Sequence, residues 1–463
     1  MQKTDAKKMM VEGPLFKNIL LFSIPLIFSQ VLQVLFNMAD VAVVGKFSGD
    51  IPLGAVSSTS TLVVLLTGFL IGLGSGINVK IAQYYGAKKD EDVKHTVSTS
   101  FIISVVAGFI ILIATFFFGK FFLEVLKTDE KLIDKATLYL KIYAFGMPAL
   151  GIFNFGNGVL SATGDTKRPL VYLTIAGVLN IGLNFFFVLV FKMDVDGVSL
   201  ASIISQYVSA ALVIIRMIKI KTCYKLDFKD FVVSGKKTLE VLYLGIPAGI
   251  QNAIFSIANL FIQGAVNSFS TDVISGVGAA MNADTIIYNV MGAFYTACSS
   301  FIGQNYGAGN KDRMLKSYFI CTFYSFMIAL ILGAFLFFKG DLFLRIFTDT
   351  PAVIEAGMEK IRIMAFAFSV SAFMDCTIAA SRGIGKTLAP TIIVILGSCV
   401  FRVIWIFTVF AHFRTLTSLF LLYLFSWAIT AVAEIIYFII AFRKTSCSLK
   451  TADTGNTDAP VAA

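Results

Sequence analysis

Long apolar segments recur along nearly the whole chain, and short polar segments separate them. Each apolar segment has about 20 residues or more, enough for a helix to cross about 30 Å of hydrocarbon. We predict twelve membrane-spanning helices, at residues 15–42, 52–78, 96–122, 132–160, 168–191, 196–218, 238–266, 274–302, 314–338, 352–380, 388–411 and 416–442. The first segment is too long for a cleavable signal peptide, and no small-residue cleavage site follows it. We therefore expect it to remain as a helix.

The two halves of the chain resemble each other at an offset of about 221 residues. Residues 82–87 (AQYYGA) match 303–308 (GQNYGA), and residues 164–169 (GDTKRP) match 385–390 (GKTLAP). Each half has an even number of predicted spans, so the two repeats cross the membrane in the same orientation. The pattern predicts an all-α integral membrane protein with twelve transmembrane helices in two six-helix lobes related by a parallel internal repeat.

The polar segments between the spans suggest how the chain is divided. The longest of them is rich in lysine and separates the two repeats, and the last residues of the chain are small and polar. We expect five regions: a cytoplasmic N-terminus (1–14), a first lobe (15–218), a cytoplasmic linker (219–237), a second lobe (238–443) and a disordered cytoplasmic tail (444–463).

Composition and charge support a membrane protein. Hydrophobic residues make up 57% of the chain and charged residues 14%, with a net charge of +10. If the N-terminus is cytoplasmic, most of the 38 lysines and arginines fall on the cytoplasmic side of the twelve spans. The positive-inside rule therefore predicts a multi-pass protein of the inner or plasma membrane with both termini in the cytoplasm. The basic charge reflects this topology, so we expect the lipid bilayer and no nucleic acid as a partner. We expect a monomer.

The cysteines and histidines indicate neither a cofactor nor a metal. The six cysteines have no CxxC pattern and no metal-binding spacing, and the two histidines lie far apart in the sequence. We also find no HExxH, GxSxG or P-loop motif, so an enzyme is not expected. A transiently bound ion is still possible, because carboxylates within the membrane can bind a cation or a proton.

Prolines and glycines mark special points in the predicted helices. Pro25 and Pro247 occupy equivalent positions in the first span of each half, where each removes a backbone hydrogen bond and bends its helix. They are candidate hinges, with a static kink as the alternative. Gly68, Gly72 and Gly76 fall four residues apart in the second span, a spacing that favours close helix packing over ligand binding.

Asp40 is the best candidate for a residue that binds a cation or a proton within the membrane. It lies in an apolar segment 15 residues after Pro25, about 22 Å along a helix. In hydrocarbon, a carboxylate charge is costly unless a proton, a metal ion or an organic cation neutralises it. The alternative is an acid that caps a neighbouring helix. Asn180 and Asn184 project from one helix face at a spacing of four residues, where their amides can ligate sodium or join helices.

The second half contains two acids in apolar surroundings, Asp284 and Asp375. Both are candidates for coupling, and a structural ion pair with Arg402 is the alternative. Glu434 is expected to reach toward the basic end of the last span, and Glu240 to lie at the cytoplasmic start of the seventh. We include neither of these glutamates among the candidate residues.

The repeated motifs resemble those of a known family. Residues 83–87 and 304–310 are similar to the GQxxGAxN signature of MATE (multidrug and toxic compound extrusion) transporters. Residues 162–169 and 382–390 are similar to the RGxGDxxxP element of the same family. The resemblance covers residues 10–443 and implies export of organic cations or other drug-like molecules in exchange for sodium or protons.

The resemblance also implies roles for individual residues. Asp40 matches the acid on the first helix that couples ion binding to transport in such proteins, and Asn180 matches an asparagine of the fifth span. Ser202 matches a hydroxyl that completes the ion site in some members, which implies a Na⁺ site at Asp40, Asn180 and Ser202; small-residue packing is the alternative for Ser202. Asn184 stands where many bacterial members have an aspartate, so we expect this site to neutralise one positive charge.

A flippase for lipid-linked saccharides is the alternative function, because such proteins also use duplicated helix bundles. A flippase handles an anionic pyrophosphate, so its cavity should be rich in arginine and lysine. The charges expected in the middle of the membrane are mostly acidic here, which favours cationic substrates.

Overall fold

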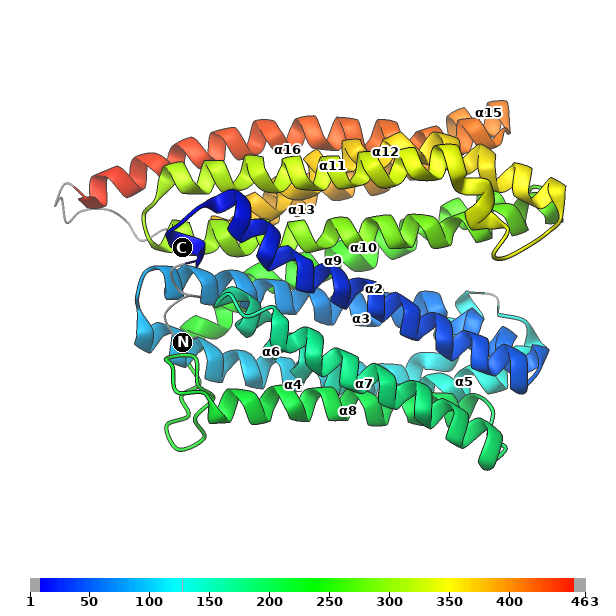
Figure 1. The fold of residues 1–463 in the computed structure, drawn as a ribbon, viewed down its shortest axis with the longest axis horizontal. Helices are drawn as coiled ribbons and strands as arrows, with labels where there is room; N and C mark the ends of the chain where they lie inside the picture. The colour runs from blue at the N-terminus through cyan, green and yellow to red at the C-terminus, as the bar shows by residue number, and fades with distance from the viewer. Residues whose placement is uncertain (1–8, 127, 454–463) are drawn as a thin grey trace. The chain divides into compact units, whose positions relative to one another are not determined.

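The computed structural model describes residues 9–126 and 128–453, and within these ranges it is built from helices joined by short loops (Figure 1). The helices of the first half are α2 (Leu15–Phe47), α3 (Asp50–Gly86), α4 (Asp90–Val125), α5 (Glu130–Ala144), α6 (Met147–Ala162), α7 (Lys167–Phe185), the π-helix η1 (Phe186–Val190) and α8 (Val195–Lys219). Those of the second half are α9 (Gly235–Val266), α10 (Thr271–Gly307), α11 (Lys311–Leu344), α12 (Pro351–Gly383), α13 (Leu388–Val394), η2 (Ile395–Val400), α14 (Phe401–Trp405), η3 (Ile406–Phe410), α15 (Ala411–Phe413) and α16 (Leu416–Asp453).

Twelve segments of the described chain are suited to crossing a membrane, as the sequence predicts. Eleven are helices that are long and apolar enough, and the twelfth is the bent pair of α5 and α6. The predicted fourth span, 132–160, is therefore not one straight helix: α5 and α6 meet at an angle of 48°. Pro148 lies in the first turn of α6. Backbone N–H groups in the first turn have no partner within the helix, so the N–H that proline lacks costs nothing there and a new helix can begin.

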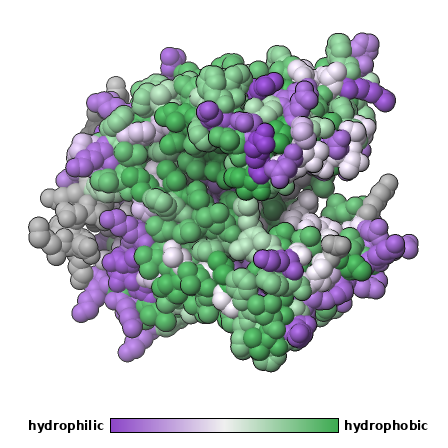
Figure 2. All heavy atoms as spheres, turned by 45° about the vertical axis from the view of Figure 1, so that its right-hand side comes forward, coloured by the Kyte–Doolittle hydropathy of each residue, from purple (hydrophilic) through white to green (hydrophobic). Residues whose placement is uncertain are grey.

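The outer surface of the helices is apolar. Figure 2 shows hydrophobic residues over much of the visible face, and hydrophilic residues gathered toward its edges. Phe117, Phe338 and Phe407 are 72%, 73% and 67% exposed, respectively. A soluble protein rarely exposes so much contiguous apolar surface. We conclude that these side chains face lipid, and that the protein is an all-α, multi-pass membrane protein.

The described chain forms two compact units. The first unit consists of Ile24–Ile81 and Lys89–Ser256, and the second contains the described residues up to Ser23, Ala82–Lys88 and the described residues from Ile257 onward. These units differ from the predicted lobes, because the start of α2 belongs to the second unit and the start of α9 to the first. Within the first unit, α6 packs against α4 and α8; within the second, α12 packs against α10, α11 and α16 (Figure 1).

The C-terminal end of the chain differs from the prediction. Helix α16 continues to Asp453, so residues 444–453 are helical and are not part of a disordered tail. Residues 454–463 lie outside the described residues.

The repeated signature motifs form a reciprocal contact within the second unit. A Cβ placed on Gly86, at the end of α3, would lie 2.0 Å from the backbone oxygen of Gln304. A Cβ placed on Gly307, at the end of α10, would lie 1.9 Å from the backbone oxygen of Gln83. Only glycine allows such a close approach, so the duplicated sequence motif is a duplicated packing contact. The side chain of Gln83 adds a hydrogen bond of 2.9 Å to the carbonyl of Gly383.

A second glycine contact joins α3 to the beginning of α9 within the first unit. A Cβ on Gly72 would lie 2.3 Å from the nitrogen of Gly249, and one on Gly76 would lie 2.5 Å from the nitrogen of Gly245. One turn away, Asn252 donates a 2.9 Å hydrogen bond to the carbonyl of Gly68. The expected packing role of the glycines at 68, 72 and 76 is confirmed.

The loop between the fourth and fifth spans and its repeat share one turn. Gly164 and Gly385 are related by the offset of 221 residues, and both have a positive φ, of 93° and 83° respectively. Glycine adopts this conformation without the steric penalty that a Cβ brings. The RGxGDxxxP-like elements are thus turns that end one helix and begin the next.

We predict that Gly86→Ala and Gly307→Ala each destabilise the protein, because the added methyl group would force α3 and α10 apart. The expected loss is about 1–3 kcal/mol for each variant, typical of overpacking. Thermal unfolding of the purified protein in detergent measures it. Gly264→Ala is the matched control, since a Cβ there would have nothing within 4 Å. Equal melting temperatures for all three variants would contradict the reciprocal contact.

Candidate functional site

A polar centre lies inside the first unit, where α2, α7 and α8 meet. Asn184 donates a hydrogen bond from Nδ2 to Oδ1 of Asp40, and Ser202 donates one of 3.2 Å from Oγ to Oδ2. Asn180 donates to the hydroxyl of Ser202 over 3.4 Å. The four residues singled out in the first half of the sequence are therefore brought together, although up to 162 positions separate them in the chain.

Asn184 has an open acceptor in this centre. Its side chain is fully buried, its amide nitrogen is occupied by Asp40 and, over 3.4 Å, by Oδ1 of Asn180. Its amide oxygen Oδ1 has no hydrogen-bond donor among the described residues. A buried acceptor without a donor costs about 1–3 kcal/mol. Beside a carboxylate, such an oxygen suits a cation, because hard cations take oxygen ligands.

Helix α5 adds two tyrosines that sequence analysis missed. Tyr139 and Tyr143 are close enough to Asp40 to interact with it electrostatically, and their rings stack with centroids 5.6 Å apart. The hydroxyl of Tyr143 accepts a 3.2 Å hydrogen bond from the amide of Gln206 on α8. Tyrosines spaced by four residues in an apolar span look like ordinary packing residues, so no local pattern marks Tyr139, Tyr143 or Gln206 as neighbours of a site.

The local fold explains why α7 can present both amides. Asn180 and Asn184 lie one turn apart on its inner face, and the π-helical segment η1 follows directly. A π-helical segment of the second half, η3 (Ile406–Phe410), lies about 220 residues later, so both repeats have a wider helical turn at nearly the same place. Such widened turns are frequent at functional sites. In the second half, Arg402 is the residue 222 positions after Asn180, and this offset also relates Pro25 to Pro247.

In the second unit, Asp284 forms an ion pair with Lys360 of α12. The lysine side chain is only 2% exposed, and its ammonium also lies 5.4 Å from the ring centroid of Phe420. No local pattern marks Lys360 as a partner, because it follows a glutamate near the predicted start of the tenth span. Arg402, the partner predicted for a structural ion pair, contacts aromatic rings of α16 instead.

Arg402 is buried against aromatic rings of α16. Its guanidinium carbon lies 4.4 Å from the ring centroid of Tyr423 and 5.6 Å from that of Trp427. Its Nε donates a 3.2 Å hydrogen bond to the hydroxyl of Ser426. Cation–π contacts of this kind stabilise a buried arginine. Arg402 interacts with Asp375 electrostatically, at longer range.

Asp375 lies on α12 and is 8% exposed. One of its carboxylate oxygens, Oδ2, has no hydrogen-bond donor among the described residues. Tyr295 of α10 and Arg382 of α12 are its other polar neighbours. The acid is thus buried as the sequence suggested, and its role stays a prediction.

The charge balance of the second unit corrects two expectations. Lys360 and Arg402 are 1% and 2% exposed, so the buried charges in this unit are not mostly acidic. Glu434, which was expected to reach toward the membrane surface, is 0% exposed. The side chain is enclosed because α16 packs its inner face against α12 and η2.

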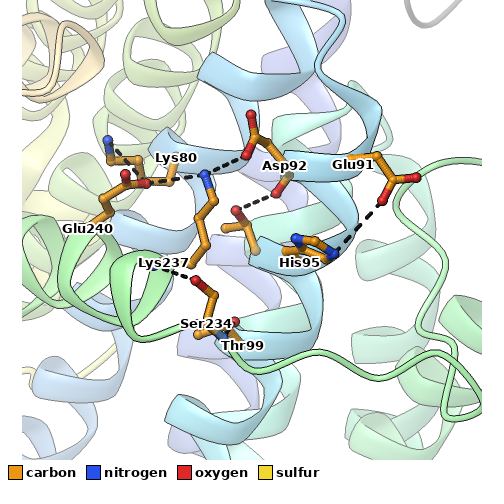
Figure 3. Close-up of polar contacts among 9 residues, drawn as sticks. Lys80, Glu91, Asp92, His95, Thr99, Ser234, Lys237 and Glu240 are labelled. Atoms are coloured by element: carbon orange, nitrogen blue, oxygen red, sulfur yellow. Dashed lines mark hydrogen bonds and ion pairs between the residues drawn. The ribbon is translucent and has the colours of Figure 1, made fainter. Parts of the chain in front are cut away.

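Another group of ion pairs lies at helix ends of the first unit that are predicted to be cytoplasmic (Figure 3). Lys237, at the start of α9, lies 2.8 Å from Asp92 of α4 and 3.7 Å from Glu240. Lys80 of α3 lies 3.9 Å from the same glutamate. Ser234 donates its backbone N–H to the hydroxyl of Thr99 over 3.1 Å. These contacts tie α9 to α3 and α4, which agrees with leaving Glu240 out of the candidate residues.

Pro25 and Pro247 both lie inside long helices, α2 and α9. The border between the two units crosses α2 directly before Pro25, between Ser23 and Ile24. It crosses α9 nine residues after Pro247, after Ser256. Pro25 therefore lies next to the border between the units and Pro247 does not. A hinge role remains a prediction for both prolines.

Comparison with known proteins gives the family. The family model MatE matches the chain twice, over residues 25–186 and 247–408. The probable multidrug resistance protein YpnP of Bacillus subtilis is 30% identical over 365 residues, which cover 77% of this chain and 79% of YpnP. The probable multidrug resistance protein NorM of Thermotoga maritima is 26% identical over 81% of this chain and 82% of its own length.

Solved structures agree on the fold. The crystal structure of a MATE protein in the bent conformation superposes with a TM-score of 0.89, covers 97% of this chain and all of its own, and is 22% identical. Taken with the two matches of the family model, this places the chain in a class of duplicated helical membrane transporters. The chain belongs to the MATE family of multidrug transporters.

We predict that Asp284 and Lys360 are energetically coupled. Asp284→Asn leaves the buried ammonium without its counter-charge and should cost about 3–5 kcal/mol of stability, whereas the double variant Asp284→Asn/Lys360→Met should recover most of that loss. Thermal unfolding of the single and double variants measures the coupling. Asp349→Asn, at an exposed loop position, is the control. Additive losses in the double variant would show that the pair is not a unit.

Proposed function

We propose that this chain is a cation-coupled antiporter that exports organic cations and drug-like molecules in exchange for Na⁺ or H⁺. The observation that carries the proposal is the centre around Asp40, where a half-buried carboxylate of α2 meets two amides and a hydroxyl. The open amide oxygen of Asn184 beside it supplies a further acceptor for a cation.

The coupling follows from the charge of this centre. Within the described residues, no lysine or arginine forms an ion pair with Asp40, so its charge must be neutralised by something that comes and goes. A proton or Na⁺ arriving from one side and a cationic substrate arriving from the other satisfy this need in turn. Because Asn184 is neutral, one positive charge balances the centre, which favours one-for-one exchange.

Na⁺ and H⁺ would use the same residues differently. For Na⁺, the oxygens of Asp40, Asn180 and Ser202 would be ligands, with that of Asn184 within the same centre. For H⁺, the carboxyl of Asp40 would carry the proton, and the amides would hydrogen-bond to either of its forms. Efflux driven separately by a sodium gradient and by a pH gradient decides between the two ions.

The second unit contributes differently in this proposal. Asp284 is a structural residue, because Lys360 already neutralises it. Asp375 stays a candidate for coupling. Bending at Pro25 and Pro247 would allow the binding region to open alternately to the two sides of the cell membrane, with both termini in the cytoplasm and the protein working as a monomer.

The flippase alternative is weaker. The two relatives described above are named probable multidrug resistance proteins, and none of the three proteins described above is named a flippase. The buried basic residues of the second unit do not support a flippase, because Lys360 is paired with an acid and Arg402 packs against aromatic rings. A site for a pyrophosphate would need basic groups that are open to the ligand.

We predict that Asp40→Asn abolishes ion-driven efflux, because an amide cannot exchange one charge for another. Efflux of a fluorescent organic cation from proteoliposomes, driven separately by a sodium gradient and by a pH gradient, is the measurement. Wild-type efflux under only one gradient would identify the ion. The control Asp349→Asn, at an exposed loop position, should keep the wild-type rate. Normal efflux by folded Asp40→Asn protein would refute the assignment.

We predict that Asn184→Asp changes the stoichiometry. A second carboxylate beside Asp40 would need a second positive charge, so the number of ions moved per substrate should rise from about one to about two. Simultaneous measurement of substrate flux and of the charge moved across proteoliposome membranes gives this ratio. An unchanged ratio, with efflux intact, would show that position 184 does not belong to the ion site.

A further inference from the structure

Glu434 is a fully enclosed carboxyl group that the proposed function does not use. It lies on α16 and is 0% exposed. Neither of its carboxylate oxygens has a hydrogen-bond donor among the described residues, and it forms no ion pair there within 4.0 Å. An ionised carboxylate without donors in a low-dielectric interior is far more costly than a neutral carboxylic acid. The carboxyl of Glu434 therefore needs a proton or a counter-charge to be stable in this interior.

The position of Glu434 on its helix explains the enclosure. On the same face of α16, one turn earlier, Thr430 forms a 3.0 Å hydrogen bond with Ser398 of η2. One turn later, Phe438 packs against Tyr318 of α11, with ring centroids 5.0 Å apart. Both neighbours point inward, so Glu434 also points into the second unit and cannot reach lipid head groups.

Two charged groups act on Glu434, both from α12: Arg382 and Asp375. They lie seven residues apart on that helix, about 10 Å. Arg382 is attracted to both acids and therefore cannot fully neutralise both. Asp375 repels the ionised form of Glu434, which favours the proton-bound form of one of the two.

The other elements that pack against α16 offer little further charge. Helices α13 and η3 have no titratable residue. The only titratable side chain on η2 is the thiol of Cys399, and Arg402 of α14 is engaged by the rings of Tyr423 and Trp427. From α11, Tyr318 directs its hydroxyl to Thr377 at 2.9 Å. A neutral carboxylic acid is the form of Glu434 that these surroundings accommodate.

We propose that Glu434 is a proton-binding site of the second unit. The carboxyl carries a proton while α12, α16 and η2 are packed as described here. When this packing opens and water enters, the carboxyl transfers the proton to water and becomes a carboxylate facing Arg382. The site is distinct from Asp40, which lies in the other unit. Its protonation does not depend on the proposed function; only its use in a transport cycle does.

Infrared difference spectroscopy of the protein in lipid tests the protonation directly. The C=O stretch of a carboxylic acid should be present in the wild type at neutral pH and lost in Glu434→Gln. Asp375→Asn identifies any contribution from the neighbouring acid, and Asp349→Asn, at an exposed position, should change nothing. An unchanged band in folded Glu434→Gln protein would overturn the proposal. If Glu434→Gln folds poorly, Glu434→Asp keeps an acid, and the band should then shift and persist.

The pH dependence of stability gives a second readout that a purely structural glutamate would not produce. A group that binds its proton more tightly in the folded than in the unfolded protein makes the fold less stable as pH rises. The melting temperature of the wild type should therefore fall toward alkaline pH, and Glu434→Gln should lose that part of the fall. The opposite result, a Glu434→Gln variant that is less stable at every pH with the same slope, would indicate a carboxylate held by Arg382.

Transport separates this proposal from the assignment of Asp40. If both hold, Asp40→Asn loses efflux under every gradient, whereas Glu434→Gln keeps the binding of the fluorescent cation and loses the part of efflux that a pH gradient drives. If Glu434→Gln shows wild-type pH-driven efflux while the infrared band is lost, Glu434 holds a proton but does not exchange it during transport, and the second half of the proposal is overturned.

Discussion

The absence of water in the hydrocarbon core governs this molecule. A polar group there must find its partner within the protein, or be neutral, because unpaired charges and unbonded amides cost several kcal/mol. The backbone meets this constraint by being helical throughout the spans, with π-helical segments where the regular pattern widens. The side chains meet it in three different ways: Asp40 is surrounded by donors, Asp284 is paired with Lys360, and Arg402 lies between aromatic rings.

The two repeats share a backbone plan but differ in what they place inside it. The first unit holds the carboxyl of Asp40 among neutral amides and hydroxyls, with hydrogen bonds from Asn184 and Ser202. The second unit holds acids and bases together: Lys360, Asp375, Arg402 and Glu434 are all buried there. The duplicated scaffold therefore encloses different charges in its two halves, and in the second unit Lys360 pairs with Asp284.

The motifs that are easiest to read in the sequence serve packing. Gly86 and Gly307 occur in a repeated signature because the ends of α3 and α10 touch each other through these two positions. Gly164 and Gly385 occur in the other signature because both turns need a positive φ. Such motifs identify a family reliably, since backbone contact tolerates no side chain. The candidate site residues Asp40, Asn180, Asn184 and Ser202 lie outside these motifs.

The sequence alone determined the number of spans, the parallel repeat, the packing role of the glycines at 68, 72 and 76, and the candidates Asp40, Asn180, Asn184 and Ser202. It could do so because hydrophobic length, repeat offset and an acid in an apolar segment are local signals. The sequence did not reveal that α5 and α6 meet at 48°, because one proline fits several geometries.

Only the tertiary structure decided which charges meet. Lys360 and Asp284 are 76 residues apart, and no local pattern marks them as partners. Tyr139 and Tyr143 become neighbours of Asp40 only because α5 lies beside the helices that present it. Glu434 looks like a residue of the helix end until the packing of α16 encloses it. The cost of a charge depends on its surroundings in three dimensions, which the order of residues along the chain does not contain.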